Sequence, residues 1–450
     1  MRRLVFLLLG VMPLLAEPAI AQTLPKGTAL TLPDAILLAM TQNPEILSAH
    51  SQVESGDHQV TVARSGLWPQ INLAETYQNT NNPMWAFGTK LNQGQITQRD
   101  FDPNRLNEPD AINNYNTSLS LGWSVYDGGR TLAGLSQAKL NTKFTRLGLK
   151  KTEQDIISQT AQAYVGLLLA GQNQKVIDKA LTTAKAHQAM IKNRYSGGFV
   201  VKSDLLRAQV RIFELTQERL QAKSQVEIAK ARLNAAMGNP MDTPLRLTTP
   251  FQICVETEEN QIVWIERALK NRPDLKQLTL QKEMALAQIK MNRAGHLPQV
   301  MLNGAYNIDT QDFDDSADSY TVGATVQLNL FAGKGISAKV KAAKADLNKV
   351  KAIYTALTHG VEVQTREAYL LTQSAWQRIT VAQQAVAQSE EALRIVMNRY
   401  KSGLLTIVDL LDAQVADQQA RTLHFKALHD YKVARIKLAT AAGVIGPDFQ

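Results

Sequence analysis

The sequence has little of what stabilises compact exported domains. Only one of its 450 residues is cysteine, Cys254, so no disulfide can form within the chain. Aromatic residues make up 6% of the sequence, too few for a thick globular core, and alanine supplies much of the 44% that is hydrophobic. This composition favours long helices that touch along narrow seams.

Long hydrophobic runs are also missing. No run of about 20 apolar residues occurs, which excludes a transmembrane helix. The apolar run LVFLLLGVMPLL, preceded by Arg2 and Arg3 and followed by the small-x-small residues 19–21, predicts a signal peptide over 1–21. The residue directly after the cleavage site is Gln22 rather than cysteine, so no N-terminal lipid anchor is expected. We expect any contact with a membrane to be made through β-strands.

Motifs for catalysis and for nucleic-acid binding are absent. The net charge is +9, but lysine and arginine are scattered at helical spacing without interleaved aromatic residues, so no nucleic acid is expected as a partner. The 7 histidines form no ligand box, and no phosphate-binding loop or serine elbow is found, so we expect no enzyme activity, cofactor or metal. Five aspartates between 309 and 318 lack the spacing of a calcium-binding EF-hand and indicate a solvated hairpin tip.

What the sequence does contain is a tandem repeat. Residues 39–77 align with 268–306 at an offset of 229, and from about residue 117 onward the offset is 205. The difference, 229 − 205 = 24, places extra residues in a segment over 79–114 that is rich in Asn, Pro, Gly and Asp. We interpret this segment as a long loop. The predicted divisions are a first repeat over 22–238, a linker over 239–260, a second repeat over 261–443 and a tail over 444–450.

Each repeat shows the same order of patterns: a helix, two strands, a long helix and a last helix. Period-2 alternation of apolar and small polar residues from 115 to 125, and from 322 to 330, indicates strands with one apolar face. The expected elements are β-hairpins over 70–126 and 299–331, long helices over 130–196 and 334–401, and last helices over 203–237 and 406–442. Because such a long helix spans about 100 Å, it needs lateral neighbours.

Four strands of about ten residues cannot close a barrel in a lipid bilayer. An open sheet would leave backbone N–H and C=O groups unpaired in lipid, which costs several kcal/mol for each group. Several subunits must therefore share one barrel, unless the same hairpins form a soluble sandwich.

One turn sequence occurs twice in the chain. RYSGGFVVKSDLLRAQV (194–210) and RYKSGLLTIVDLLDAQV (399–415) share nine of 17 positions. Gly198 and Gly403 suit the left-handed conformation that ends a helix. Asp204 and Asp409 suit the start of the returning helix, where a carboxylate complements the helix dipole. Asp412 lies three residues after Asp409 and therefore shares its helix face.

These features resemble the TolC family of outer-membrane efflux proteins over about residues 28–445. The resemblance is carried by the helix starts Asn-Pro-Glu (43–45) and Arg-Pro-Asp (272–274), by YDGG (126–129), and most specifically by GLLTIVDLLDA (403–413).

The resemblance implies a membrane α+β fold of a homotrimer. Each subunit gives four strands to a shared twelve-stranded barrel in outer-membrane lipid, and its long antiparallel helices to a periplasmic α-barrel. The implied function is a passive exit duct in the cell outer membrane for tripartite efflux or type I secretion. The implied partners are a periplasmic adaptor (membrane fusion) protein and an inner-membrane transporter of the RND, ABC or MFS class.

The resemblance also assigns residues at the periplasmic tip. Asp409 and Asp412 would line the closed tip as two cation-selective rings. Asp204 and Tyr400 match positions of a latch, and Tyr195, Gly198 and Gly403 belong to the same turns. The family's best-known form has an arginine where this chain has Leu405, so we expect Lys401 or Lys202 to replace it.

One alternative belongs to another class of protein, a periplasmic coiled-coil scaffold or adaptor that does not enter the membrane. An adaptor would carry one helical hairpin flanked by soluble β-domains, whereas this chain carries two hairpins, each preceded by alternating strands.

Overall fold

The computed structural model describes residues 29–251 and 259–448. The expected signal peptide over 1–21 and Cys254 lie outside the described residues. Part of the linker over 239–260 and the last two residues of the tail also lie outside them.

Both repeats fold into the same series of elements. The first contains α1 (Leu32–Gln42), α2 (Pro44–Ser65), β2 (Gln70–Thr80), β3 (Ile112–Tyr126), α5 (Arg130–Ser196) and α6 (Lys202–Met237). The second contains α7 (Gln261–Asn271), α8 (Pro273–Arg293), the 3₁₀ turn η2 (Ala294–His296), β5 (Gln299–Thr310), β6 (Ser316–Gln327), α9 (Gly335–Lys401) and α10 (Ile407–Ala441). The short strands β1 (Ala29–Leu30) and β4 (Arg246–Leu247) pair in parallel.

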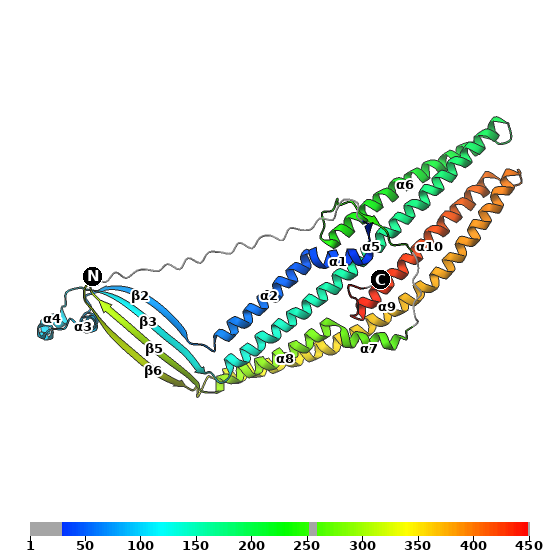
Figure 1. The fold of residues 1–450 in the computed structure, drawn as a ribbon. Coiled ribbons are helices and arrows are strands. Elements are labelled where there is room, and N and C mark those ends of the chain that lie inside the picture. The colour runs from blue at the N-terminus through cyan, green and yellow to red at the C-terminus, as the bar shows by residue number, and fades with distance from the viewer. Residues whose placement is uncertain (1–28, 252–258, 449–450) are drawn as a thin grey trace.

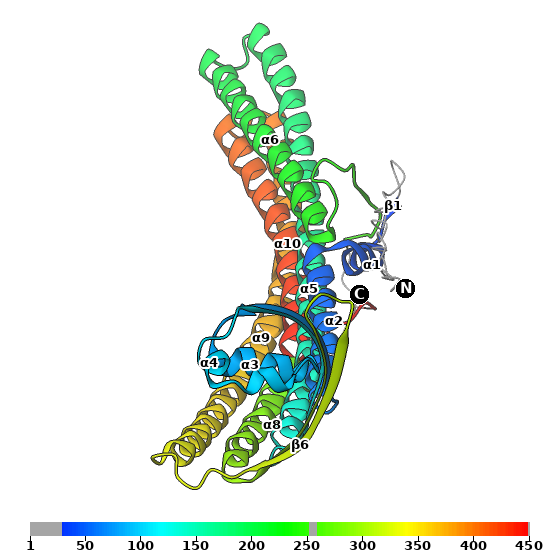
Figure 2. The ribbon, with the colours of Figure 1, turned by 90° about the vertical axis from the view of Figure 1, so that its left-hand side faces the viewer.

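The four long strands form one antiparallel sheet in the order β2-β3-β5-β6. The two repeats join at its centre, where Leu119 of β3 pairs with Tyr306 of β5. The sheet is strongly curved (Figures 1 and 2). Since β2 and β6 are its end strands, each has one edge without a partner strand among the described residues.

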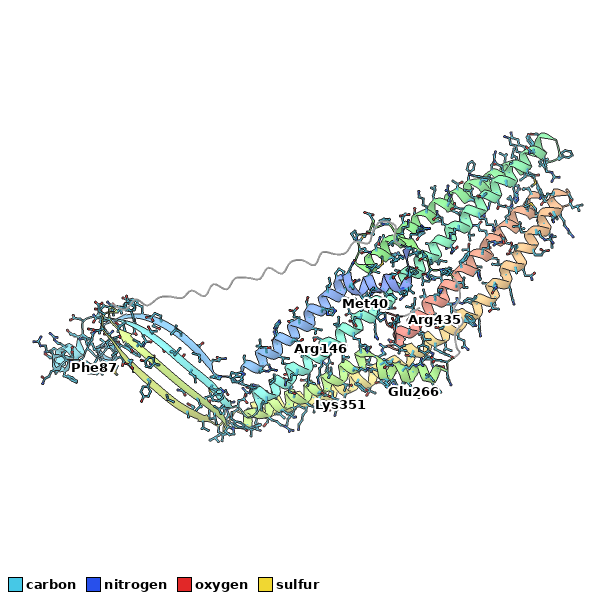
Figure 3. All side chains as sticks on the ribbon, in the orientation of Figure 1. Met40, Phe87, Arg146, Glu266, Lys351 and Arg435 are labelled. Atoms are coloured by element: carbon cyan, nitrogen blue, oxygen red, sulfur yellow. The ribbon has the colours of Figure 1, made fainter. Side chains whose placement is uncertain are left out.

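The helices form a long, thin body that extends from one end of the sheet (Figure 1). Its two longest members, α5 and α9, have 67 residues each, which corresponds to about 100 Å at the helical rise. Near the sheet they lie beside α2 and α8, and farther away they pair with α6 and α10 (Figure 1). Side chains project from the surface of this body along its length, as Lys351 and Glu266 do on one edge of it in Figure 3. Buried residues such as Tyr164 and Leu233 line the seams between helices.

Each repeat is closed by a joint in the middle of the molecule. In the first repeat, the amide of Asn43, which caps α2, donates to the carbonyl oxygen of Ala236 at 2.8 Å. In the second repeat the equivalent residue is Arg272, whose guanidinium donates to the carbonyl oxygen of Ala441 at 3.3 Å. We call these contacts the first and second joints.

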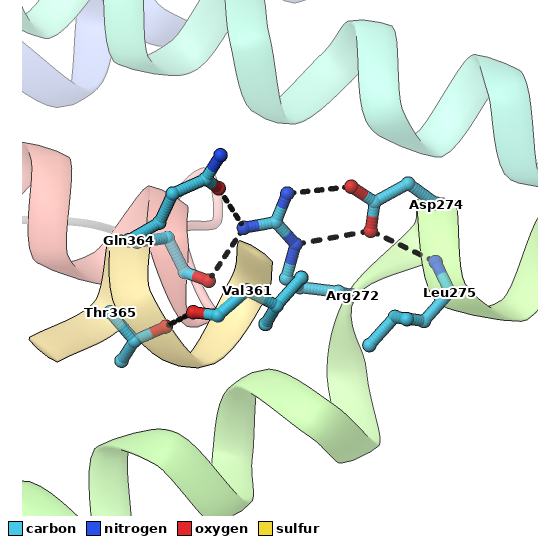
Figure 4. A network of polar contacts seen from close by, with 7 residues as sticks. Arg272, Asp274, Leu275, Val361, Gln364 and Thr365 are labelled. Carbon is cyan, nitrogen blue, oxygen red and sulfur yellow. Dashed lines mark hydrogen bonds and ion pairs between the residues drawn. The ribbon is translucent and has the colours of Figure 1, made fainter. Parts of the chain in front are cut away.

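The second joint is a larger polar network (Figure 4). Arg272 forms two parallel hydrogen bonds with Asp274, at 3.0 and 2.6 Å, and donates to Gln364 of α9 at 2.9 Å. Burial alone would raise the pKa of the Asp274 carboxyl, but the hydrogen bonds and positive charge of Arg272 outweigh it and lower that pKa.

A glycine ends the returning helix at each joint. Gly238 and Gly443 have φ angles of 78° and 66°, which only glycine adopts at little cost. A Cβ atom at Gly238 would lie 2.6 Å from the carbonyl oxygen of Gln42, and one at Gly443 would lie 3.0 Å from the backbone of Arg272. Both joints therefore need glycine for close backbone approach as well as for conformation.

The structure corrects two boundaries. The segment over 79–114 is not only a loop, because it contains α3 (Pro83–Asn92), the 3₁₀ turn η1 (Gln98–Phe101) and α4 (Pro103–Asn107). Asn and Pro, which indicate loops, also begin helices: Asn82 caps α3, and Pro83 occupies its first turn. In the second hairpin, β6 ends at Gln327, so the alternating residues after it lie beyond the strand.

None of the helices within residues 29–251 and 259–448 combines the length and the apolar character needed to cross a membrane.

Candidate functional site

The two repeated turns lie at the same end of the molecule, farthest from the sheet (Figure 1). Gly198 and Gly403 have φ angles of 77° and 76°, which confirms the predicted left-handed conformation. The amide of the residue after each glycine donates to a carbonyl oxygen five residues earlier, at 2.9 Å in both turns. These bonds pair carbonyl groups that a helix end would otherwise leave unsatisfied. We call the two turns together the tip.

Asp409 closes a capping box at the start of α10. The backbone N–H of Thr406 donates to its carboxylate at 2.8 Å and the Thr406 hydroxyl donates at 2.6 Å, while Thr406 caps the helix. These hydrogen bonds lower the pKa of the Asp409 carboxyl below 3.8. Asp412, one turn further along the helix, is exposed like Asp409. Both carboxylates are therefore accessible from a shared channel axis. Their arrangement as rings stays a prediction.

Tyr400 is buried at the tip, at 3% exposure, between the two helical hairpins. Its equivalent in the first repeat, Tyr195, is 41% exposed. Burial raises the pKa of the Tyr400 phenol, Arg194 opposes this shift, and Asp204 adds to it. The phenolic oxygen of Tyr400 has no hydrogen-bond partner among the described residues. The expected latch pair thus lies close enough to interact electrostatically, without a direct hydrogen bond in this subunit.

Arg194 makes the polar link that the sequence analysis did not anticipate. From the last turn of α5, its guanidinium donates to the backbone carbonyl of Tyr400 at 2.8 Å. The same guanidinium lies 5.4 Å from the centre of the Tyr400 ring, within cation–π range. Lys401 and Lys202, which we expected to replace the family arginine, are exposed and form no ion pair within residues 29–251 and 259–448.

An apolar cluster holds the two hairpins together behind this link. It consists of Ile191, Ala208, Tyr400, Ile407 and Leu410, which come from all four helices of the tip. Burying such side chains stabilises the contact by about 1.5–3 kcal/mol for each large residue. The hairpins of one subunit are therefore packed together at the tip.

Farther from the tip, polar contacts also join the two hairpins. Arg211 of α6 donates to Gln418 of α10 at 2.6 Å, and the Gln418 amide donates to Glu218 of α6 at 2.6 Å. His187 of α5 contacts Gln414 of α10. Burial lowers the pKa of His187, and the nearby charge of Lys401 lowers it further, so the imidazole is neutral at pH 7. All of these contacts join residues of the same subunit.

No group of three or more His, Cys, Asp or Glu side chains in residues 29–251 and 259–448 could hold a metal ion.

An open four-stranded sheet at one end and two packed helical hairpins at the other define one sector of a channel-tunnel. The fold is that of solved outer-membrane channels. CmeC of Campylobacter jejuni matches with a TM-score of 0.78 at 17% identity, over 96% of this chain and 92% of that one. VceC of Vibrio cholerae matches with a TM-score of 0.76 at 20% identity, over 92% and 96%.

The sequence profile of the family described as outer membrane efflux protein matches residues 35–239 and 264–444, so the chain belongs to that family. The protease secretion protein PrtF of Dickeya chrysanthemi is 23% identical over 93% of this chain and 89% of its own length. The alkaline protease secretion protein AprF of Pseudomonas aeruginosa is 25% identical over 99% and 89%. Outer membrane protein TolC of Escherichia coli (strain K12) is 22% identical over 90% and 81%. The predicted TolC resemblance and the function as an outer-membrane exit duct are confirmed.

Proposed function

We propose that three copies of this chain form one continuous tube. Each copy gives four strands to a twelve-stranded barrel in outer-membrane lipid and two helical hairpins to a periplasmic tunnel. The observation that carries this proposal is the sheet, which has an unpaired edge on β2 and another on β6. In lipid, such edges are stable only when neighbouring sheets pair with them. We further propose that a leader over residues 1–21 exports the chain.

Within this class of duct, we propose protein secretion of type I as the main task. The partners are then an ABC transporter of the inner membrane and a periplasmic adaptor. Similarity over nearly the full chain to PrtF and AprF, both named for protease secretion, supports this task. Drug efflux with an RND or MFS transporter is the second candidate, favoured by similarity to the outer membrane efflux protein BepC of Brucella suis at 21% identity.

At the tip, we propose that the rings of Asp409 and Asp412 select cations, and that the contact between hairpins keeps the tunnel closed at rest. Three copies of each carboxylate around one axis attract cations and repel anions. Asp204, Tyr400 and Arg194 hold the closed arrangement, with Tyr195 near the outer surface of the tip. The neutral pair formed by His187 and Gln414 supports them.

Deleting the gene distinguishes type I protein secretion from drug efflux. We expect the deletion strain to lose one or more proteins from its culture medium, with drug susceptibility little changed, and a plasmid copy of the gene to restore secretion. Increased susceptibility with unchanged secreted proteins would assign the duct to efflux. Washed membranes provide the control for localisation, because an adaptor that never enters lipid would be released without detergent.

A further inference from the structure

The segment between β2 and β3 is a compact unit, which we call the outer cap (residues 83–107: α3, η1 and α4). Lys90 of α3 pairs with Asp100 of η1 at 2.9 Å, and the backbone and hydroxyl of Thr97 both donate to Asp100 at 2.8 Å. These bonds hold the pKa of Asp100 well below its usual range. Phe87 and Phe101 pack edge to face, with ring centres 5.8 Å apart. Figure 3 shows Phe87 at the end of the molecule opposite the tip.

One face of the outer cap is anchored to the sheet by buried amides. The Gln93 amide donates to the carbonyl oxygen of Asn113 and to the side-chain oxygen of Asn114, both at 2.8 Å. The Asn114 amide then donates to Asp309 of β5 at 2.7 Å. Gln93 and Asp309 are each 3% exposed. This corrects the expectation that Asp309 belongs to a solvated hairpin tip.

The anchored face of the sheet is its polar face. Asn114 alternates along β3 with Tyr115, and it therefore lies on the same side as Ser118 and Ser120. A Cβ atom added at Gly94 would lie 3.4 Å from the Cβ atom of Ala317 in β6, so the cap reaches across to the other end strand. Figure 2 shows α3 and α4 on the concave side of the sheet. In a closed barrel, this side faces the channel.

α3 also carries apolar side chains that are exposed. Met84, Trp85 and Leu91 are 82%, 63% and 52% exposed, whereas Ala86 and Thr89 of the same helix are buried. In a barrel made of three such sheets, the concave sides surround one axis, so the exposed apolar side chains of the three caps surround it too. Packing them together would remove them from water.

We propose that the outer caps of three subunits meet on the channel axis through Met84, Trp85 and Leu91, and that they narrow the outer mouth of the duct. The partner of these side chains is the same set on the other two copies. The inference rests on the proposed trimer. It adds a constriction at the end of the duct that is opposite the helical tip.

Labelling from outside intact cells tests the constriction without any need to open the tip. The full chain carries Cys254→Ser and Ser120→Cys, which places a reporter thiol on the polar face below the cap. We expect a small maleimide to label this thiol and a long polyethylene-glycol maleimide not to label it. Adding Trp85→Glu and Leu91→Glu places like charges on the axis, and we expect the long reagent then to label. Equal labelling by the long reagent without the charge substitutions would overturn the proposal.

Cross-linking tests the contact between caps directly. In the Cys254→Ser background, we expect Trp85→Cys to give disulfide-linked subunit pairs on oxidation. The matched control is Leu73→Cys, which is 74% exposed on the opposite face of the sheet and should give none. Detergent-extracted particles are weighed in parallel. Trimers without pairs through position 85 would overturn the cap contact alone, whereas monomers would overturn the proposed function.

Discussion

Arg194 and Arg399 occupy the same position in two copies of one turn, yet their surroundings differ. Arg194 reaches the carbonyl of Tyr400 in the other hairpin, whereas Arg399 is exposed. We predict that Arg194→Ala weakens the closed tip by about 1.5–3 kcal/mol, the usual contribution of a hydrogen bond that involves a charged group. The measurement is channel conductance in planar bilayers, which should rise. Arg399→Ala is the matched control, and an equal rise in both variants would contradict the role of Arg194.

The capping box makes a prediction about acid. Because its hydrogen bonds lower the pKa of Asp409 in the folded chain, they contribute stability above the ordinary pKa of 3.8. This contribution is lost as the pH falls through the lowered value. We expect the cation preference of the open channel to persist at about pH 4, a value near which an unperturbed aspartate is half protonated.

Reversal potentials across a salt gradient measure this preference. Thr406→Val removes the hydroxyl donor and should move the loss of selectivity to higher pH, while the double variant Asp409→Asn, Asp412→Asn should show weak selectivity throughout. If the pH at which half of the cation preference is lost were unchanged in Thr406→Val, the capping box would have no role in selectivity.

The sequence predicted the backbone of the tip better than its side-chain contacts. A glycine after a long helix has one common conformation, and Gly198 and Gly403 both adopt it. The orientation of a side chain depends instead on what packs beside it. Tyr195 and Tyr400 are equivalent in the repeat, but Tyr400 alone belongs to the cluster that joins the hairpins. The repeated sequence motif does not indicate which of the two tyrosines is buried.

At the scale of elements, the two faces of β6 are expected to respond differently to charge. Val322 is 81% exposed on the apolar face, and Thr321, its neighbour, lies on the polar face. We predict that Val322→Arg destabilises the folded barrel by about 2–4 kcal/mol if it lies near the bilayer midplane, while Thr321→Arg has a small effect. Urea unfolding in lipid vesicles measures both. Equal effects would mean that the faces are assigned wrongly.

The strands were predictable because alternation is a strong signal, and β3 and β6 contain the segments where that signal is regular. The outer cap was not predictable as a folded unit. Its contacts join residues that are distant in the sequence, such as Gln93 and Asp309 through Asn114. Its composition alone is that of a loop, and local composition carries no information about such a bridge.

For the whole molecule, the open sheet and the thin helical body lead to one prediction. Particles purified in detergent should contain three copies and show threefold symmetry, because neither the sheet edges nor the long helices are covered within one subunit. Native mass measurement and class averages from electron microscopy would check this. A stable single copy that stays dissolved without detergent would exclude a shared wall.

The two joints make the halves of this duplicated chain chemically unequal. The Asn43 amide carries no charge that acid can remove, whereas the Arg272 network depends on the ionised carboxylate of Asp274. Because its pKa is lowered in the folded chain, that carboxylate stabilises the second repeat at neutral pH. This stabilisation is lost in strong acid. Acidification should therefore loosen residues 261–443 while residues 29–238 hold, so that two halves of common origin come apart one after the other.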